Sequence, residues 1–286
     1  MTTLKAIILG AVQGFAEFLP ISSSGHLVIF NHLLASQGSS DLLFDVLVHL
    51  GTFLAVLVAF WRDVLRLLVE CFSFLGDLFK GRLRGGRTTP SRNFLYMLVL
   101  SLLPLFLVLP VKGFIELLFQ NPVFVGFALL VTGCILLLSS RFSEGRIGAA
   151  SVRARQALVV GFTQLIAIIP GVSRSGSTIT AGLACGFKRD FAVRYSFLLS
   201  LPTTLAAVFL EFYDVIKEGA LPENWKKSIF SLWTGPYLVG MVAAAVTGYA
   251  AIGLVRLLIK DNKFSAFSYY CFVVGCATII YFGFIR

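Results

Sequence analysis

The chain has 286 residues, of which 57% are hydrophobic and only 13% are charged. About 25% of residues are charged in an ordinary soluble domain, so this composition excludes that class and is typical of a polytopic membrane protein. The formal net charge of +10 usually reflects cytoplasmic loops beside anionic headgroups in such proteins. No basic stripe interleaved with aromatic residues is present, so nucleic acid is not expected as a partner.

The first apolar segment, residues 4–34, is interrupted by the stretch PISSSG at residues 20–25. Each half is too short to cross a bilayer, which takes about 20 residues. Irregular backbone at membrane depth is tolerated only where protein or a water-filled cavity surrounds it. The segment therefore predicts a re-entrant hairpin of two half-helices and a polar loop.

A second interrupted segment, residues 156–187, is broken by PGVSRSG at residues 170–176 and predicts a second re-entrant hairpin. Around the two hairpins lie apolar runs long enough to span a bilayer. These predicted transmembrane helices cover residues 42–61, 93–111, 122–140, 190–211, 233–258 and 265–285.

Loop charges predict the orientation of these helices. The loops 62–92 and 141–155 and the turn 256–263 are rich in Lys and Arg, which places all three on the cytoplasmic side. Threading six spans through these constraints puts both termini on the opposite side. The first hairpin then enters the membrane from outside and the second from inside.

Opposed hairpins indicate an inverted repeat, and short sequence matches support it. GFAE at residues 14–17 is similar to GFTQ at residues 161–164, and each is followed by a proline, serines and a Ser-Gly pair. The predicted fold is an all-α polytopic membrane protein with six transmembrane helices and two re-entrant helix–loop–helix hairpins. We expect one integral membrane domain over 1–286, comprising a first repeat 1–140, a cytoplasmic linker 141–152 and a second repeat 153–286. The two broken loops should meet near the bilayer midplane, where such folds place their sites.

The second loop carries an arginine among hydroxyl groups. Arg174 at membrane depth is costly, so it should face a cavity or a partner. Its guanidinium matches phosphate oxygens in a bidentate manner, and the glycines let an anion approach the backbone. The loop predicts an oxyanion cradle. The alternative is a structural arginine paired with Glu17 that locks the two hairpins together; both can hold in the empty state.

The first loop supplies complementary groups. Gln13 and Glu17 are four residues apart and share one helical face, where an amide and a carboxylate can ligate a hard divalent cation. The serines at 22–24 are candidate nucleophiles, and His26 is a candidate general base or nucleophile. The same serines can instead cap a helix that starts after Pro20.

These groups in a membrane-embedded fold fit phosphoryl transfer on an amphiphile, which needs positioning and charge neutralisation above all. A transporter or flippase is the main alternative, because inverted repeats with broken helices are typical of transporters and an arginine would bind a phosphate headgroup equally well.

Two motifs resemble those of a known family. Gln13-x-x-x-Glu17 followed by FLPISSSGH, and PGVSRSGST at residues 170–178, resemble the two signatures of the undecaprenyl-diphosphate phosphatases of the BacA/UppP family. The resemblance covers essentially the whole length. It implies removal of the terminal phosphate of undecaprenyl diphosphate at the outer face of the bacterial cytoplasmic (inner) membrane. It also implies recycling of the lipid carrier for peptidoglycan synthesis, a divalent cation (Mg²⁺ or Ca²⁺) as cofactor, and bacitracin resistance.

The resemblance also implies residue roles. Glu17 and Gln13 would serve the cation or acid–base chemistry, and Ser23 and His26 would form the nucleophile–base pair, in an order that the sequence leaves open. The remaining residues expected to bind the diphosphate are Ser22, Ser24, Ser173, Arg174, Ser175 and Thr178. Gln13 departs from members with Glu at this position, and a neutral amide is a poorer cation ligand. Expected partners are the polyprenyl diphosphate and membrane lipids, and the sequence leaves open whether the chain forms a homodimer.

Overall fold

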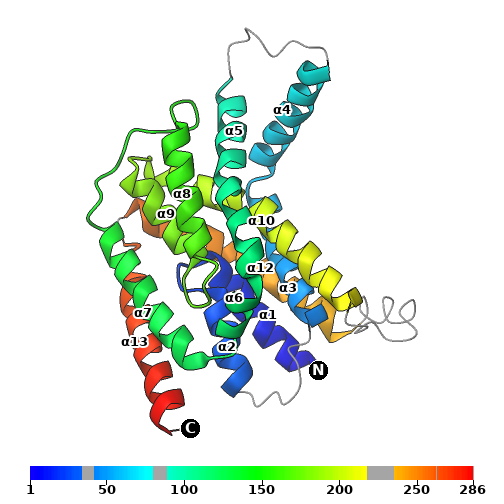
Figure 1. The fold of residues 1–286 in the computed structure, drawn as a ribbon, viewed down its shortest axis with the longest axis vertical. Coiled ribbons are helices and arrows are strands. Elements are labelled where there is room, and N and C mark those ends of the chain that lie inside the picture. The colour runs from blue at the N-terminus through cyan, green and yellow to red at the C-terminus, as the bar shows by residue number, and fades with distance from the viewer. Residues whose placement is uncertain (34–41, 80–88, 218–234, 262, 286) are drawn as a thin grey trace.

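The computed structural model describes residues 1–33, 42–79, 89–217, 235–261 and 263–285 (Figure 1). Within these residues the regular structure is helical, apart from one isolated bridge between Ile147 and Phe187. The first helices are α1 (Thr3–Phe18), α2 (Ser23–Leu33), α3 (Leu42–Ala59), α4 (Trp61–Phe79), α5 (Pro90–Leu102), the 3₁₀ segment η1 (Leu103–Val111), α6 (Lys112–Leu118) and α7 (Pro122–Ser139). The others are α8 (Ala154–Ile166), α9 (Arg174–Ala184), α10 (Arg189–Lys217), α12 (Pro236–Lys260), α13 (Ala266–Ile280) and the π-helical end η2 (Tyr281–Ile285).

Several of these helices are long and apolar enough to cross a membrane. Among the described residues there are five, or six if the bent pair α3–α4 is counted as one span. The all-α class and the multi-pass character predicted from composition are therefore confirmed. The five are Pro90–Val111, Pro122–Ser139, Arg189–Leu210, Pro236–Lys260 and Ala266–Ile285.

The predicted break in the first segment lies between α1 and α2, and proline chemistry explains it. A residue before proline is driven out of the helical region, and Leu19, before Pro20, has φ −63° and ψ 143°. The chain then turns at Ser22, whose φ of 70° lies in the left-handed region that side chains rarely adopt. Helix α2 begins directly afterwards, at Ser23.

The predicted break in the second segment lies between α8 and α9. It turns at Gly171, whose φ of 94° favours glycine. A Cβ added there would also come within 2.7 Å of the Val125 carbonyl oxygen of α7. The loop therefore needs glycine both for its conformation and for its close contact with α7.

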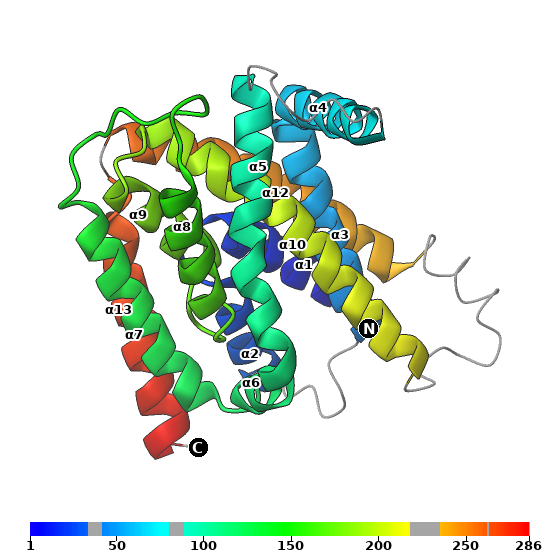
Figure 2. The ribbon, with the colours of Figure 1, turned by 45° about the horizontal axis from the view of Figure 1, so that its top comes forward.

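The two broken helix pairs each pack against a long helix from the other half of the chain. α1 runs along α12, and α8 runs along α5. Both contacts are close: a Cβ added at Gly10 would lie 2.2 Å from the Gly240 carbonyl oxygen, and one at Gly161 would lie 2.5 Å from that of Ser101. α7 and α13 lie side by side in both views, and α3 packs against α10 (Figure 2).

The largest core cluster lies between these crossing helices. It is rich in aromatic side chains that contact one another edge-on or at a tilt. Its largest fully buried members include Phe18, Phe94, Phe187, Tyr195 and Phe197. This packing fixes α10 against α1 and α5, and so holds the ends of the two broken segments in place.

The region 62–92, predicted as a loop, differs in the structure. Residues 61–79 form the 19-residue helix α4, and α5 begins at Pro90. The charged residues of α4 lie along one side of this helix, which an amphipathic pattern of period 3.6 explains. Residues 80–88, which carry most of the basic charge of the predicted loop, lie outside the described residues.

Candidate active site

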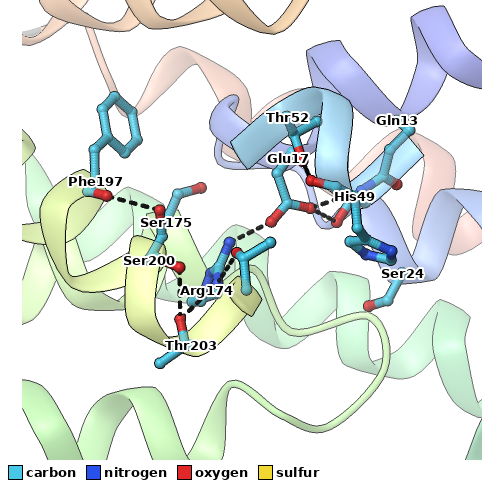
Figure 3. A network of polar contacts seen from close by, with 12 residues as sticks. Gln13, Glu17, Ser24, His49, Thr52, Arg174, Ser175, Phe197, Ser200 and Thr203 are labelled. Atoms are coloured by element: carbon cyan, nitrogen blue, oxygen red, sulfur yellow. Dashed lines mark hydrogen bonds and ion pairs between the residues drawn. The ribbon is translucent and has the colours of Figure 1, made fainter. Parts of the chain in front are cut away.

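The two interrupted segments meet at their breaks, where Glu17 of α1 forms an ion pair with Arg174 of α9 (Figure 3). Glu17 lies in the last turn of α1, and Arg174 is the first residue of α9. The Ser175 hydroxyl donates a second link, to the Leu19 carbonyl oxygen at 3.3 Å. The Glu17–Arg174 pair weighed from the sequence is thus present, and it joins the two halves of the chain.

The Glu17 carboxylate is almost enclosed, with 8% of its side chain exposed. Its Oε2 accepts hydrogen bonds from the Ser23 hydroxyl at 2.6 Å and from the Gln13 amide nitrogen at 3.0 Å. Gln13 reaches it because residues four apart share one face of α1. A carboxylate that accepts from a serine hydroxyl can take its proton when the oxygen attacks an electrophile.

Arg174 also bonds to α10. Its Nη1 donates to the hydroxyls of Thr203 at 3.0 Å and Thr204 at 3.3 Å. The Arg174 side chain is about a quarter exposed, so it is not closed off from a ligand. The sequence analysis missed both threonines. Their only signal is a pair of hydroxyls directly after Pro202, in a helix that also carries Ser196 and Ser200.

The other predicted cradle hydroxyls are engaged within the loop and helix. Ser173 caps α9 by accepting from the Gly176 backbone N–H at 3.1 Å. Thr178 donates to the Arg174 carbonyl oxygen at 2.8 Å and shares a 2.6 Å hydrogen bond with Ser196. The Ser173 and Ser175 hydroxyls lie 3.3 Å apart. These groups set the position of Arg174, and their role as anion donors stays a prediction.

Thr132 of α7, which the sequence analysis also missed, anchors the second loop. Its hydroxyl donates to the Gly171 carbonyl oxygen at 2.8 Å and accepts from the Ser173 backbone N–H at 3.0 Å. A single buried hydroxyl thus satisfies two backbone groups of an irregular segment, as buried backbone requires.

The three serines of the first loop have different surroundings. The Ser22 hydroxyl accepts from the Gly25 backbone N–H at 3.3 Å and lies 3.3 Å from the Ser24 hydroxyl, as expected for residues that cap a helix. Ser23 is the one whose hydroxyl is hydrogen-bonded to Glu17. Ser24 is drawn on the side of His49, away from Arg174 (Figure 3).

His26 faces a different helix. Its Nδ1 is 2.8 Å from the Ser22 carbonyl oxygen, and its Nε2 is 2.7 Å from the Tyr270 hydroxyl of α13. The two rings stack with centroids 5.6 Å apart. Since a carbonyl only accepts, Nδ1 carries the proton in the neutral imidazole, and Nε2 accepts from Tyr270. The structure therefore brings Ser23 to Glu17, and His26 to Tyr270.

The third side of the site is formed by α3. His49 lies beside Glu17, close enough for an electrostatic interaction, and Thr52 follows one turn later (Figure 3). The two motifs of the sequence do not include His49. A narrow pocket opens here between α1, α3 and α10, lined mostly by apolar side chains and hydroxyls. Its lining comprises Glu17, Phe18, Thr52, Phe53, Val56, Ser200, Leu201 and Thr204.

A cation would find few ligands from the protein alone. Within the described residues no cluster of three or more His, Cys, Asp or Glu side chains is present. However, the Gln13 Oε1 is buried beside Glu17 and makes no hydrogen bond to the described part of the chain. An orphaned oxygen next to a carboxylate fits a hard cation that takes its remaining ligands from water and phosphate oxygens.

The comparison with known proteins gives one family. Residues 6–277 match the family described as bacitracin resistance protein BacA. A protein of Methanosphaera stadtmanae named undecaprenyl-diphosphatase is 38% identical over 281 residues, covering 97% of each chain. One with the same name from Halothermothrix orenii is 39% identical over 285 residues, covering 99% of each chain. The chain therefore belongs to the BacA family, as the two motifs that meet at Glu17 and Arg174 indicate.

Proposed function

We propose that this protein hydrolyses undecaprenyl diphosphate to undecaprenyl phosphate and inorganic phosphate. The observation that carries the proposal is the meeting of Ser23, Glu17 and Arg174, contributed by two broken helices at the core of a multi-pass protein. They supply a hydroxyl, a base and a phosphate-binding cation in one place. The names of the relatives supply the substrate. The product would return to the carrier cycle of peptidoglycan and other envelope polymers, and overproduction would confer bacitracin resistance.

The arrangement supports the following order of events. The Nη2 group of Arg174 exchanges the Glu17 carboxylate for the diphosphate, while its Nη1 group keeps the hydrogen bonds to Thr203 and Thr204. The Glu17 carboxylate, released from its counter-ion, takes the proton of Ser23 as the Ser23 oxygen attacks the terminal phosphorus. The bond from that phosphorus to the bridging oxygen breaks, and undecaprenyl phosphate leaves. Glu17 gives its proton to the departing undecaprenyl phosphate. It then takes a proton from the water that attacks the phosphoserine phosphorus and returns it to the Ser23 oxygen as the bond from Ser23 to phosphorus breaks, which releases inorganic phosphate.

His26 is the alternative nucleophile or base. It is one turn from Ser23 on α2, but its Nε2 is hydrogen-bonded to Tyr270. The direct 2.6 Å hydrogen bond to Glu17 favours Ser23 for this role.

Gln13 and Glu17 are the residues that would hold a divalent cation, Mg²⁺ or Ca²⁺, in this proposal. The cation would neutralise charge on the transferring phosphoryl group. The orphaned Gln13 Oε1 supports this assignment, and the neutral amide implies weaker binding than a second carboxylate would give.

We further propose six spans and two re-entrant hairpins related as an inverted repeat, in a bacterial cytoplasmic membrane with the site open to the outer side. Helix α1 of the first half packs on α12 of the second half, and α8 of the second half packs on α5 of the first. This reciprocal packing supports the repeat. The orientation is supported by residues 140–153, 185–188, 260–261 and 263–266, which gather at the end opposite the C-terminus (Figure 2). The proposal that the site opens to the outer side of the membrane rests on the family resemblance.

The test is phosphate release from undecaprenyl diphosphate by the purified protein, with and without EDTA. We expect release that EDTA abolishes and that Arg174→Ala lowers about 1000-fold, the range reported for a transition-state arginine in phosphoryl transfer. Loss in Ser23→Ala with residual release in His26→Ala would support Ser23 as nucleophile; the reverse would support His26.

A polyprenyl-phosphate flippase is the second candidate, favoured by the exchanged helix packing that resembles an inverted repeat. A carrier needs Arg174 for binding but no reaction at Ser23. Folded protein that binds the diphosphate in detergent and releases no phosphate would support the carrier and contradict the hydrolase.

A further inference from the structure

Helix α4 carries an apolar stripe that the described protein does not cover. None of its residues is buried. The exposed side chains recur at helical spacing, with Val69 67% exposed, Phe72 72% and Phe79 88%. Together with these three, the stripe comprises Trp61, Leu65 and Leu68. A surface of this kind in a folded protein indicates a partner.

The opposite face of α4 is polar and tied to the helix bundle. Arg92, in the first turn of α5, donates to Glu70 at 3.3 Å, to Asp77 at 2.8 Å and to the Ser73 hydroxyl at 2.9 Å. Near the start of α4, Asp63 pairs with Arg194 of α10. The polar face is thus fixed to two spanning helices, which leaves the apolar stripe pointing away from them.

These ion pairs also set the charge of the helix. Its acidic groups Asp63, Glu70 and Asp77 are matched by Arg92 and Arg194, which belong to other helices. Of the two arginines of α4 itself, Arg66 lies 3.8 Å from Asp63, which it shares with Arg194, and keeps 66% of its side chain exposed. Arg62 is exposed and stacks over the exposed Trp61 ring at 5.3 Å. The free surface of α4 is therefore apolar on one side and positive at its edge.

Helix α4 turns sharply away from the helix that precedes it. It leaves α3 at an angle of 89°, and it lies crosswise at the end of α5 in Figure 2. The 18 residues of α3 span about 27 Å, close to the hydrocarbon thickness, so α3 can cross the bilayer alone. A helix perpendicular to α3 at its end then runs in the plane of the membrane surface.

We propose that α4 is an interfacial helix that binds anionic lipid. Its apolar stripe lies at the boundary between headgroups and acyl chains, and Arg62 and Arg66 contact the headgroup charges. Trp61 stands at the level that aromatic side chains favour in membranes. The lipid surface, at the end of the molecule where α5 begins, is the partner that an unpaired apolar stripe edged with arginine fits.

Nitroxide labels on the full-length protein in nanodiscs test this. Single cysteines at Leu68, Val69 and Phe72 report the stripe, and cysteines at Arg62 and Arg66 report the polar edge, in a background without the native cysteines. A label at Phe106, exposed within the spanning segment Pro90–Val111, is the depth control. In discs containing about a third phosphatidylglycerol, we expect the stripe labels to be accessible to oxygen and the labels at the polar edge to be accessible to a nickel chelate. The stripe labels should lie at a depth of about 5–10 Å, which is shallower than the label at Phe106.

Several outcomes would overturn the proposal. Stripe labels as deep as Phe106 would make α4 part of a span. Dipolar broadening between labels at Val69 would assign the stripe to a second copy of the chain. The stripe labels could also reach the same depth in discs of neutral lipid as in discs with phosphatidylglycerol, and keep that depth in an Arg62→Gln, Arg66→Gln double variant. That result would show that anionic headgroups do not contribute to the binding of α4.

Discussion

Glu17 holds together three groups that catalysis would have to separate. Its carboxylate accepts from Ser23 and Gln13 through one oxygen and pairs with Arg174 through the other. Each donor comes from a different part of the chain: α1 itself, the start of α2 and the start of α9. The negative charge of one side chain therefore aligns the two loops before any substrate arrives, which lowers the cost of organising the site.

Glu17→Gln tests this role at nearly constant shape. The amide cannot neutralise Arg174 or accept the Ser23 proton, so we expect kcat for phosphate release to fall by at least about 100-fold, the lower range of a lost general base. Cation dependence should weaken as well. Steady-state assays across a magnesium titration measure both, with the exposed Glu144→Gln as the matched control. Unchanged kcat would remove Glu17 from the chemistry.

Tyr270→Phe tests the surroundings of His26. The change keeps the stacked ring and removes the hydroxyl that is hydrogen-bonded to Nε2. The loss of one neutral hydrogen bond costs about 1 kcal/mol, so we expect kcat for phosphate release to fall roughly fivefold while KM stays constant. Tyr269→Phe, on the adjacent and exposed tyrosine, should have no effect. The nitrogen chemical shifts of labelled His26 would show a change of tautomer population only for Tyr270→Phe.

At this scale the sequence predicted the residues of the two motifs and missed their tertiary neighbours. Glu17 and Arg174 stand out because charges inside apolar segments are costly. Thr203, Thr204 and Tyr270 lie in long, mostly apolar helices where hydroxyl groups are common, so the threonine pair after Pro202 is a weak signal and Tyr270 has none. Their contacts depend on how α10 and α13 pack, and the pattern of a single helix does not encode that packing.

At the scale of elements, glycine sets how closely α1 approaches α12. A Cβ added at Gly14 would lie 2.1 Å from the Thr247 hydroxyl oxygen and 2.4 Å from the Ala244 carbonyl oxygen. We expect Gly14→Ala to lower the free energy of unfolding by about 1–3 kcal/mol, as overpacking does. Thermal unfolding in detergent measures the change.

Gly253→Ala is the matched control in α12, because an added Cβ there meets nothing within 4 Å. It should be neutral or stabilise the protein by up to about 1 kcal/mol, since alanine favours a helix more than glycine does. Equal effects of the two substitutions would mean that helix propensity, and not the α1–α12 contact, determines the stability at Gly14.

The breaks in the helices were predictable, whereas α4 was not. Proline and glycine act locally, so PISSSG and PGVSRSG mark the ends of α1 and α8 in the sequence itself. The residues of α4 combine charged side chains of both signs with apolar ones, and a reading by basic charge alone assigns them to a loop. Only the 3.6-residue spacing of the apolar ones indicates the helix.

At the scale of the whole molecule, the two halves are interlocked. Each broken helix packs on a long helix of the other half, and the Glu17–Arg174 pair closes the arrangement at the centre. Neither half can therefore form the site alone. The proposed division into 1–140 and 153–286 describes two related folding patterns within one unit of function.

The proposed topology predicts which positions are reachable from outside the cell. If α1 and α2 form a re-entrant hairpin, the exposed residues Thr3 and Leu33 lie on the same side of the membrane; if the pair crosses the membrane, they lie on opposite sides. We expect Thr3→Cys and Leu33→Cys, in a background without the native cysteines, to react with an impermeant maleimide in intact spheroplasts. Gly148→Cys, where an added side chain meets nothing within 4 Å, should react only after the membrane is opened. Protection of Leu33→Cys alone would contradict the re-entrant hairpin, and reaction of Gly148→Cys from outside would invert the orientation that the loop charges predict.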